Sequence, residues 1–400
     1  MKLAVVYGET PAPPNHGGRL DVYQRLLALK EAGARISLVC WRNPKAGETE
    51  DGIRASLKGL VDEVHVFDIT THFERPWLLL RYPGWVSRRA LARADLNRLV
   101  GAMRAFAPDA ILIDGLPSAV AGLQLAGALK QRYFFRSANR EFKYVSDQYR
   151  LNTNWRGRLR SALDMTGLER FERGVIGGSV KYYDCSQIDL AYWTSEGYPN
   201  GAWLPPVLDR HHAARLSDVA DWQPSYDVGY LGNLVNLNNV QGVLWFVETV
   251  VPILRSAEPG LRIRIAGSRP VDPVIEACRK AGVDLLANPP QAADVLRDCR
   301  VLVNPVFQGS GVNLKSIEML HTPAGLVSTT VGVTGMPQES FGHFEIADTP
   351  EAFARGILAK LAIGLDGLAA QSRDRAAARS LFAPEFTASM LRDMTPDRMP

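Results

Sequence analysis

Two parts of this chain each show an apolar strand, a glycine-containing loop, a helix and a second strand in succession. The first part begins with Lys2–Tyr7, a short continuous apolar run that is typical of a parallel strand buried on both faces. Residues 8–18 are rich in glycine and proline, and leucines then recur at helical spacing up to Gly33. Residues 36–39 form the next apolar run. This order predicts the βαβ unit of an α/β domain.

The alternation continues along the first half and starts again near residue 227. The first half predicts further strands at 64–67, 110–113, 133–135 and 181–184, with helices at 88–106 and 157–174. The second half predicts strands at 227–231, 262–266, 301–303 and 325–328, with helices at 240–254, 273–281, 313–320 and 351–363. We therefore predict two Rossmann-like, doubly wound α/β domains that face each other across a cleft, with ligands beyond the carboxyl ends of the strands.

The domain boundaries follow from changes in this pattern. We expect an N-terminal domain at 1–205 and a C-terminal domain at 227–378. Residues 206–226, rich in proline and polar residues, are interpreted as a linker. Residues 379–400 are expected to form a helical tail that returns to the N-terminal domain.

Composition excludes several other classes of protein. The chain is 46% hydrophobic and 22% charged, which argues against a disordered or fibrous chain. Its four cysteines are scattered without CxxC spacing, so neither a zinc site nor a disulfide framework is indicated. The longest apolar stretch, 110–129, is interrupted by Asp114, Pro117 and Gln124 and does not resemble a membrane-spanning helix. We expect a cytoplasmic enzyme.

Charge is distributed unevenly between the two halves. Residues 1–210 contain 29 Lys and Arg against 22 Asp and Glu, a net charge of +7, whereas the remainder carries −3. Within the basic half, the segment from Arg75 to Arg104 has seven arginines against one acid and contains two tryptophans. One interpretation is a peripheral contact with an anionic membrane surface, and the other is a solvated helix face over a core. No nucleic-acid partner is predicted.

The segment from Asn304 to Glu318 carries the main chemical signal. It runs from a strand end through a glycine loop into a helix, whose first amide groups and dipole favour a phosphate. Lys315 in the first turn can neutralise phosphate charge. Glu318 follows on the same face, where a carboxylate could bridge two ribose hydroxyls. The simpler alternative is a helix cap followed by a surface Lys–Glu pair.

The motifs around this segment resemble those of GT-B fold glycosyltransferases of the retaining family 4, the glycosyl transferases group 1. The resemblance lies in Tyr-Leu-Gly-Asn at 230–233, Ile-Ala-Gly at 265–267, Gly-Ser-Gly-Val-Asn-Leu-Lys-Ser-Ile-Glu at 309–318 and the segment 327–336. The first half contributes His-Gly-Gly-Arg at 16–19, Arg-Ser-Ala-Asn-Arg-Glu at 136–141 and Leu-Pro-Pro at 204–206.

This resemblance implies a nucleoside-diphosphate sugar as co-substrate, such as a UDP- or GDP-sugar, and no other cofactor. Glu318 would hold the ribose, and Lys315 would carry much of the diphosphate charge. The implied donor site comprises Gly17, Gly18, Arg19, Gly232, Asn233, Arg269, Asn288, Gly309, Ser310, Gly311, Val312, Asn313, Leu314, Lys315 and Glu318. An adjoining sugar or acceptor pocket would include His16, Arg136, Asn139 and Arg140, with Glu141 positioning the acceptor.

The chain departs from the family pattern at several positions. The first acid of the family's Glu-x7-Glu pair falls on Ser310, a frequent basic residue falls on Asn233, and a pocket histidine falls on Ala138. These changes indicate a different set of contacts to the donor, an unusual sugar in the donor or the loss of activity. Arg136 and Arg140 beside Ala138 suggest a sugar that carries a carboxylate, against the simpler interpretation of ion-pair residues.

We expect transfer with retention to a glycan or lipid-linked acceptor, in polysaccharide or glycoconjugate biosynthesis. No protein nucleophile is required, because the diphosphate is already a good leaving group. We predict metal independence, because no DxD-like acidic pair follows a strand. The first alternative is a non-catalytic GT-B relative that binds nucleotide or glycan as a partner subunit. A dinucleotide-dependent oxidoreductase is disfavoured, because residues 8–18 lack GxGxxG spacing.

Overall fold

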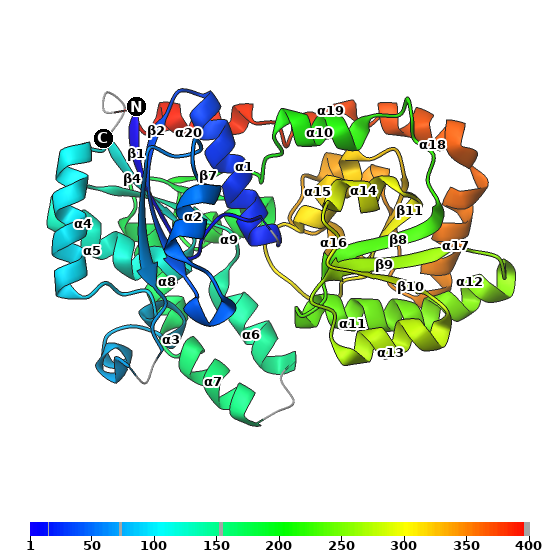
Figure 1. The fold of residues 1–400 in the computed structure, drawn as a ribbon, viewed down its shortest axis with the longest axis horizontal. Coiled ribbons are helices and arrows are strands. Elements are labelled where there is room, and N and C mark those ends of the chain that lie inside the picture. The colour runs from blue at the N-terminus through cyan, green and yellow to red at the C-terminus, as the bar shows by residue number, and fades with distance from the viewer. Residues whose placement is uncertain (15, 72–73, 152–154, 396–400) are drawn as a thin grey trace. The chain divides into compact units, whose positions relative to one another are not determined.

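The computed structural model describes residues 1–14, 16–71, 74–151 and 155–395. It divides into two compact units, one formed by Met1–Val207 with Pro384–Pro400 and the other by Leu208–Ala383 (Figure 1). The segment predicted as a linker at 206–226 is largely part of the second unit. It contains helix α10 (Arg210–Ser217), whose first turn is capped by the side chain of Asp209.

The first unit is built on a seven-stranded sheet in which all the strand pairs recorded are parallel. Its order is β3-β2-β1-β4-β5-β6-β7, the Rossmann order extended by one strand. The strands are β1 (Lys2–Tyr7), β2 (Arg35–Arg42), β3 (Glu63–Asp68), β4 (Ala110–Asp114), β5 (Tyr133–Ser137), β6 (Tyr182–Asp184) and β7 (Gly201–Trp203). The predicted strands of this half all lie in this sheet, and β7 was missed because its sequence, Gly-Ala-Trp, contains no β-branched residue and begins with glycine.

Helices cover both faces of this sheet and create two apolar cores. One core is closed by α1 (Gly17–Glu31), α2 (Glu50–Ser56) and α20 (Glu385–Asp393). The other is closed by α3 (Gly84–Ser87), α4 (Arg93–Phe106), α5 (Ala119–Leu129), α6 (Glu141–Leu151), α8 (Leu168–Gly178) and α9 (Gln187–Ser195). The predicted helix at 157–174 is two helices, α7 (Trp155–Met165) and α8, because Gly167 adopts a left-handed φ of 74° between them.

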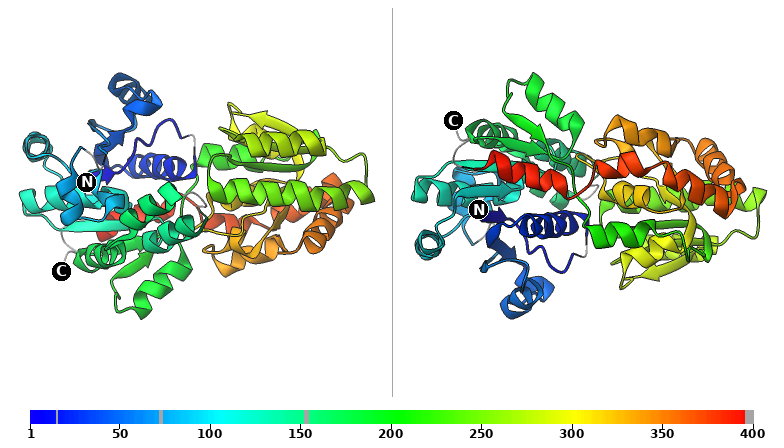
Figure 2. Two further views of the ribbon diagram at one scale, coloured as in Figure 1. Left: turned by 90° about the horizontal axis from the view of Figure 1, so that it is seen from below. Right: turned by 90° about the horizontal axis from the view of Figure 1, so that it is seen from above.

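The end of the chain packs on the first unit. Figure 2 shows the red helix α20 beside the blue helix α1. Lys181 pairs with Asp393 at 2.7 Å, and the Trp203 and Phe386 rings meet edge to face at 5.3 Å. The tail therefore completes the core on the α1 side of the sheet, as far as the described residues extend to 395.

The second unit contains a six-stranded parallel sheet in the order β10-β9-β8-β11-β12-β13. Its strands are β8 (Tyr226–Asn233), β9 (Ile263–Ser268), β10 (Asp284–Ala287), β11 (Cys299–Asn304), β12 (Gly325–Ser328) and β13 (Glu345–Ile346). Its helices include α11 (Leu237–Trp245), α12 (Val251–Ala257), α13 (Asp272–Ala281), α14 (Ala292–Arg297), α15 (Leu314–His321), α16 (Thr330–Val333), α17 (Pro350–Ala362), α18 (Gly364–Arg373) and α19 (Ala376–Ser380). The prediction of two Rossmann-like α/β domains is confirmed.

One helical run, Leu237–Ala257, is long and apolar enough to cross a membrane by length and composition alone. It consists of α11, the π-helical turn η4 (Phe246–Val250) and α12. Val243, Phe246, Val250 and Leu254 on one side of it are buried in the core of the second unit. A core helix passes the same test of length and composition, so the run is weak evidence for a membrane span.

Candidate functional site

The carboxyl edge of the second sheet brings a glycine loop and a helix start together. Strand β11 ends at Asn304, the loop follows, and α15 begins at Leu314. Gly311 has a φ of 70°, a conformation that side chains disfavour and that lets the loop turn into the helix. The buried amide of Asn304 donates to Ser316 Oγ at 2.9 Å and so joins the strand end to the helix.

Lys315 lies in the first turn of α15 and is held by three neutral oxygens. Its Nζ donates to Tyr230 Oη at 2.9 Å and to the Oδ1 atoms of Asn239 and Asn304, each at 3.3 Å. The ammonium also lies 4.1 Å from the centre of the Tyr230 ring. The three contacts come from β8, α11 and β11, so three elements fix the position of one cation.

The charge of Lys315 has no close counter-ion. Among the described residues, no carboxylate oxygen forms an ion pair with its Nζ within 4.0 Å. Burial lowers the pKa of Lys315 to about 7, and the more distant charge of Glu318 offsets only part of this effect. An anion that arrived at the start of α15 would therefore stabilise the ammonium form.

Glu318 is engaged by a histidine. Its Oε1 lies 3.0 Å from Nε2 of His212, which belongs to α10. Burial alone would lower the pKa of His212, but the hydrogen bond and charge of Glu318 outweigh it and raise that pKa. Glu318 is buried within α15, so the carboxylate predicted to hold a ribose has a fixed position in the structure.

Other predicted donor residues gather at the same edge. The carbonyl of Asn233 accepts from the Asn239 side chain, which links the end of β8 to the Lys315 cluster. Arg269 and Asn288, just after β9 and β10, have φ values of 53° and 52°, and the Asn288 side chain accepts the Arg269 amide at 2.9 Å. A left-handed φ is uncommon for residues other than glycine, and this hydrogen bond ties the two residues that adopt it to each other.

The predicted glycine loop of the first unit is fixed by ion pairs. His16 caps helix α1, which begins at Gly17 and Gly18, and its Nε2 lies 3.3 Å from Glu9. Arg19 pairs with Glu9 at 3.3 Å and with Glu48 at 2.5 Å. Burial acts to raise the pKa of Glu9, but His16 and the nearby arginines outweigh it and lower that pKa to about 2. The guanidinium of Arg19 is thus already paired in this structure.

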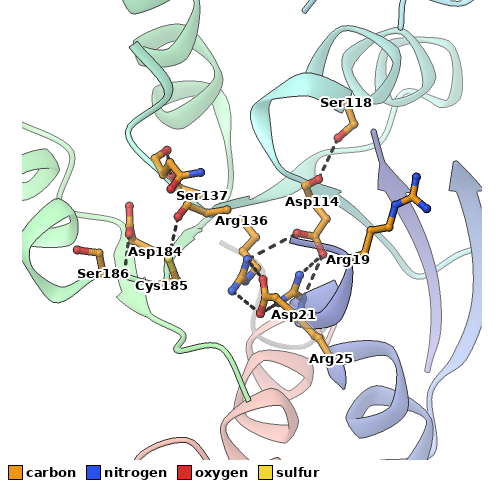
Figure 3. A network of polar contacts seen from close by, with 12 residues as sticks. Arg19, Asp21, Arg25, Asp114, Ser118, Arg136, Ser137, Asp184, Cys185 and Ser186 are labelled. Carbon is orange, nitrogen blue, oxygen red and sulfur yellow. Dashed lines mark hydrogen bonds and ion pairs between the residues drawn. The ribbon is translucent and has the colours of Figure 1, made fainter. Parts of the chain in front are cut away.

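Arg136 belongs to a buried charge network and not to a sugar pocket. Figure 3 shows its guanidinium between Asp21 and Asp114, with Arg25 on the other side of the same carboxylates. Arg136 contacts Asp21 at 2.8 Å, and Arg25 contacts Asp114 at 2.6 Å and Asp21 at 2.9 Å. Arg136 is 0% exposed, so the interpretation that it recognises a sugar carboxylate is corrected by its burial.

The neighbouring predicted residues are also partly enclosed. Arg140 lies 4.1 Å from the centre of the Tyr192 ring and 3.4 Å from Asp189. Burial, and then the charge of Glu172, raise the pKa of Glu141 to about 8, while Asn139 bonds to its carboxyl group. Glu172 accepts the amides of Glu141 and Phe142 and so caps α6. Whether Glu141 positions an acceptor stays a prediction.

Sequence reasoning missed the residues that surround Lys315 and Glu318. Tyr230 and Asn239 are 85 and 76 residues from Lys315, and His212 is 106 residues from Glu318. Asn304 lies within the predicted segment, but its contact with Lys315 was not predicted. His212 was placed in a linker, and no local pattern connects it to α15. Among the described residues, no group of three or more His, Cys, Asp or Glu side chains could hold a metal ion.

Comparison with known proteins bears on the second unit directly. Residues 225–362 match the family described as "Glycosyl transferases group 1". This part of the chain belongs to that family. The matched residues of the group 1 glycosyltransferase domain include the glycine loop, Lys315 and Glu318. The resemblance predicted from the motifs is confirmed.

Relatives of the whole chain agree with this assignment of fold. An uncharacterized 44.6 kDa protein in the cps region of Klebsiella pneumoniae is 23% identical and covers 89% of this chain and 90% of its own length. Sucrose-phosphate synthase from Thermosynechococcus elongatus has a TM-score of 0.68 at 15% identity, covering 98% of each chain. Anabaena HepE in complex with UDP has a TM-score of 0.64 at 11% identity, covering 98% of this chain and 99% of its own.

Proposed function

We propose that this protein transfers a glycosyl group from a nucleoside-diphosphate sugar to a hydroxyl of a saccharide or lipid-linked acceptor. The observation that carries the proposal is Lys315, a lysine held by neutral oxygens at the start of α15 in a group 1 glycosyltransferase domain. A diphosphate would supply the missing counter-charge, and the helix N-terminus would add oriented amides. The UDP bound to the structurally similar HepE supports a nucleotide donor.

The acceptor class is argued from a relative and from the charge of the first unit. The similar Klebsiella protein is named for its cps region, which supports a role in polysaccharide biosynthesis. We place the reaction in the cytoplasm, at the inner face of a membrane. The basic first unit, with a net charge of +7 over residues 1–210, favours an anionic or membrane-associated acceptor.

In the proposed reaction, the bond between the anomeric carbon and the phosphate oxygen breaks while the acceptor oxygen bonds to the same face of that carbon. Because the acceptor attacks the same face of the carbon, the configuration is retained without a protein nucleophile. The acceptor proton passes to the departing phosphate, so the protein need not supply a base. Lys315 and the amides that open α15 stabilise the charge that grows on the diphosphate. Glu318 orients the donor through its ribose. No metal ion is invoked.

Thermal shift with UDP-, GDP- and ADP-sugars tests donor binding first, and release of nucleoside diphosphate tests turnover. We expect one base series to stabilise the protein. Lys315→Met should reduce the shift and remove the turnover, while Lys280→Met should change neither, because Lys280 is an exposed residue of α13. Binding without transfer to any acceptor or water would indicate the non-catalytic partner subunit. The absence of every shift would contradict both functions.

A further inference from the structure

The exposed large apolar side chains of the first unit are concentrated on two elements. They are Trp77 and Leu80 on the 3₁₀ turn η2 (Pro76–Leu80), at 62% and 92% exposure, and Trp155, Leu159 and Leu163 on α7, at 68%, 57% and 46%. Ile188 is the sixth such side chain among the described residues of this unit. The second unit shows six, each between 37% and 44% exposed, and only Val235 and Leu237 among them are close in the chain. Single exposed apolar residues are ordinary, but a cluster marks an interaction surface.

Helix α7 is oriented with its apolar side outward. Trp155, Leu159 and Leu163 follow one another at intervals of four residues and so lie along one line of the helix. On the opposite side, the polar residues Ser161 and Asp164 are buried against the unit. This is the reverse of the arrangement that water favours for a surface helix, and it indicates an apolar medium outside α7.

The two elements are held together through α3. Residues 81–83 connect η2 to α3, and α3 packs against α7. The contact is close, because a Cβ on Gly84 would lie 2.7 Å from Asp164 Oδ1 and 3.1 Å from the Leu163 carbonyl. Figure 1 shows α3, α6 and α7 gathered at the lower end of the first unit. These helices come after the ends of β3 and β5 in the chain, the edge at which ligands of such domains bind.

The charge of these elements identifies the occupant. Among the described side chains of η2, α7 and the residue that follows η2, Arg81 and Arg158 are exposed, whereas the acid of α7, Asp164, is buried. Arg81 directly follows Leu80 in the chain, and Arg158 directly precedes Leu159. The combination of tryptophan, leucine and arginine on one surface suits the headgroup region of an anionic bilayer. By contrast, Arg75, Arg88 and Arg89 of the basic segment donate to backbone carbonyls inside the unit, so they contribute little to such a surface.

We propose that η2 and α7 form a docking surface for an anionic lipid bilayer, with Trp77, Leu80, Trp155, Leu159 and Leu163 inserted among the headgroups. This proposal does not depend on the donor site of the second unit. In this proposal η2 and α7 make the contact with the lipid, and the basic segment 75–104 as a whole is not required for it.

Co-sedimentation of the full chain with vesicles tests the proposal. We expect binding to vesicles of phosphatidylcholine and phosphatidylglycerol in equal parts, weaker binding at high salt, and little binding to phosphatidylcholine alone. The double variant Leu80→Glu/Leu159→Glu should bind at least about tenfold more weakly, because two carboxylates would have to enter the headgroup region of like charge. Ile275→Glu replaces an apolar residue that is 42% exposed on α13 of the second unit, and this variant should bind like the unaltered chain.

Two further measurements keep the outcome clear. Thermal unfolding of the double variant should match that of the unaltered chain, since both residues replaced are exposed. Sedimentation equilibrium without lipid should show the same mass for both. Failure of the unaltered chain to bind anionic vesicles at low salt would overturn the proposal. Equal binding of the double variant and the unaltered chain would overturn it as well. A self-associated species that the double variant loses would also overturn it, because the surface would then be an interface between copies of this chain.

Discussion

The Nε2 atom of His212 lies 3.0 Å from Oε1 of Glu318, which joins helix α10 to the helix that carries Lys315. The pair connects the segment that begins the second unit to the residue expected to hold the ribose of the donor. Glu318 would otherwise be a buried carboxylate with a costly charge. The contact therefore gives one histidine two roles, in stability and in the position of a binding group.

The first prediction concerns the pH dependence of this pair. The pKa of His212 is raised in the folded protein, so the pair stabilises the fold fully below the unfolded value of 6.5 and loses that contribution as the pH rises through the folded pKa. We expect His212→Gln to lower the free energy of unfolding by about 1–2 kcal/mol near pH 6, and by less near pH 8. Denaturant unfolding at both pH values measures the difference.

His211→Gln provides the matched control, because His211 is the exposed neighbour of His212 on the same helix. It should show no such change with pH. A loss of stability in His212→Gln that is the same at both pH values would mean that the contribution of His212 is packing and not charge.

The elements of the fold were predictable where a local pattern carries them. Lys2–Tyr7 and Gly325–Ser328 match the predicted strands at both ends, because parallel strands buried on both faces are continuous apolar runs. Strand β10 and the two-residue β13 were missed, since they lie at the edge of the sheet and are only partly buried or exposed. Helices α7 and α8 were predicted as one helix, because the turn at Gly167 between them is short.

The candidate site was predictable only in its sequence-local part. The glycine loop, Lys315 and Glu318 lie in one segment of fifteen residues, Asn304 to Glu318, and the order of residue types identifies them. The partners that fix their charge come from β8, α10 and α11, and no spacing relates those residues to α15. The sequence left two interpretations of Arg136 open, sugar recognition and ion pairing, for the same reason. Its partners Asp21 and Asp114 are brought to it by the order of strands in the sheet.

The second prediction concerns Lys315 and the pH dependence of donor binding. Its pKa is about 7 without ligand, and a bound diphosphate favours the ammonium form, so binding above this pH must take up a proton. We expect the affinity for the stabilising nucleotide sugar to fall as the pH rises from about 7 to 9, by at most about tenfold per pH unit. Calorimetry in two buffers of different ionisation heat measures both the affinity and the proton uptake.

Lys315→Met should bind the same nucleotide sugar at least about tenfold more weakly, with no dependence on pH over this range. Lys280→Met, which removes an exposed lysine from the Glu276 ion pair of α13, should keep the behaviour of the unaltered chain. Proton uptake that persists in Lys315→Met would assign the titration to another group.

The third prediction concerns the buried charge network of the first unit. Arg136→Met leaves the shared carboxylates of Asp21 and Asp114 with Arg25 as their remaining close partner in the network. An uncompensated buried charge is expected to cost about 3–5 kcal/mol of unfolding free energy. Nucleotide-sugar affinity should be unchanged, because the Arg136 side chain is 0% exposed and is bound to the carboxylates of the network. Arg98→Met, which breaks the exposed pair with Asp95, should cost less than about 0.5 kcal/mol. A stable Arg136→Met protein that had lost activity toward an acidic sugar would restore the sugar-recognition interpretation.

The fourth prediction concerns the contact between α11 and the start of the glycine loop. A Cβ on Gly242 would lie 2.2 Å from the carbonyl oxygen of Pro305, which follows the Asn304 that holds Lys315. Backbone on both sides leaves no flexible atom to move, so Gly242→Ala should lose about 1–3 kcal/mol of stability and weaken nucleotide-sugar binding by displacing the loop.

Gly101 is the matched position, because it also lies inside a helix, α4, and a Cβ there would meet nothing within 4 Å. Gly101→Ala should therefore stabilise the protein by about 0.5–1 kcal/mol, the usual gain when alanine replaces glycine in a helix. Denaturant unfolding of the two variants should thus give changes of opposite sign. Equal gains in both would show that α11 can shift away from Pro305 at little cost and that its packing does not set the position of the loop.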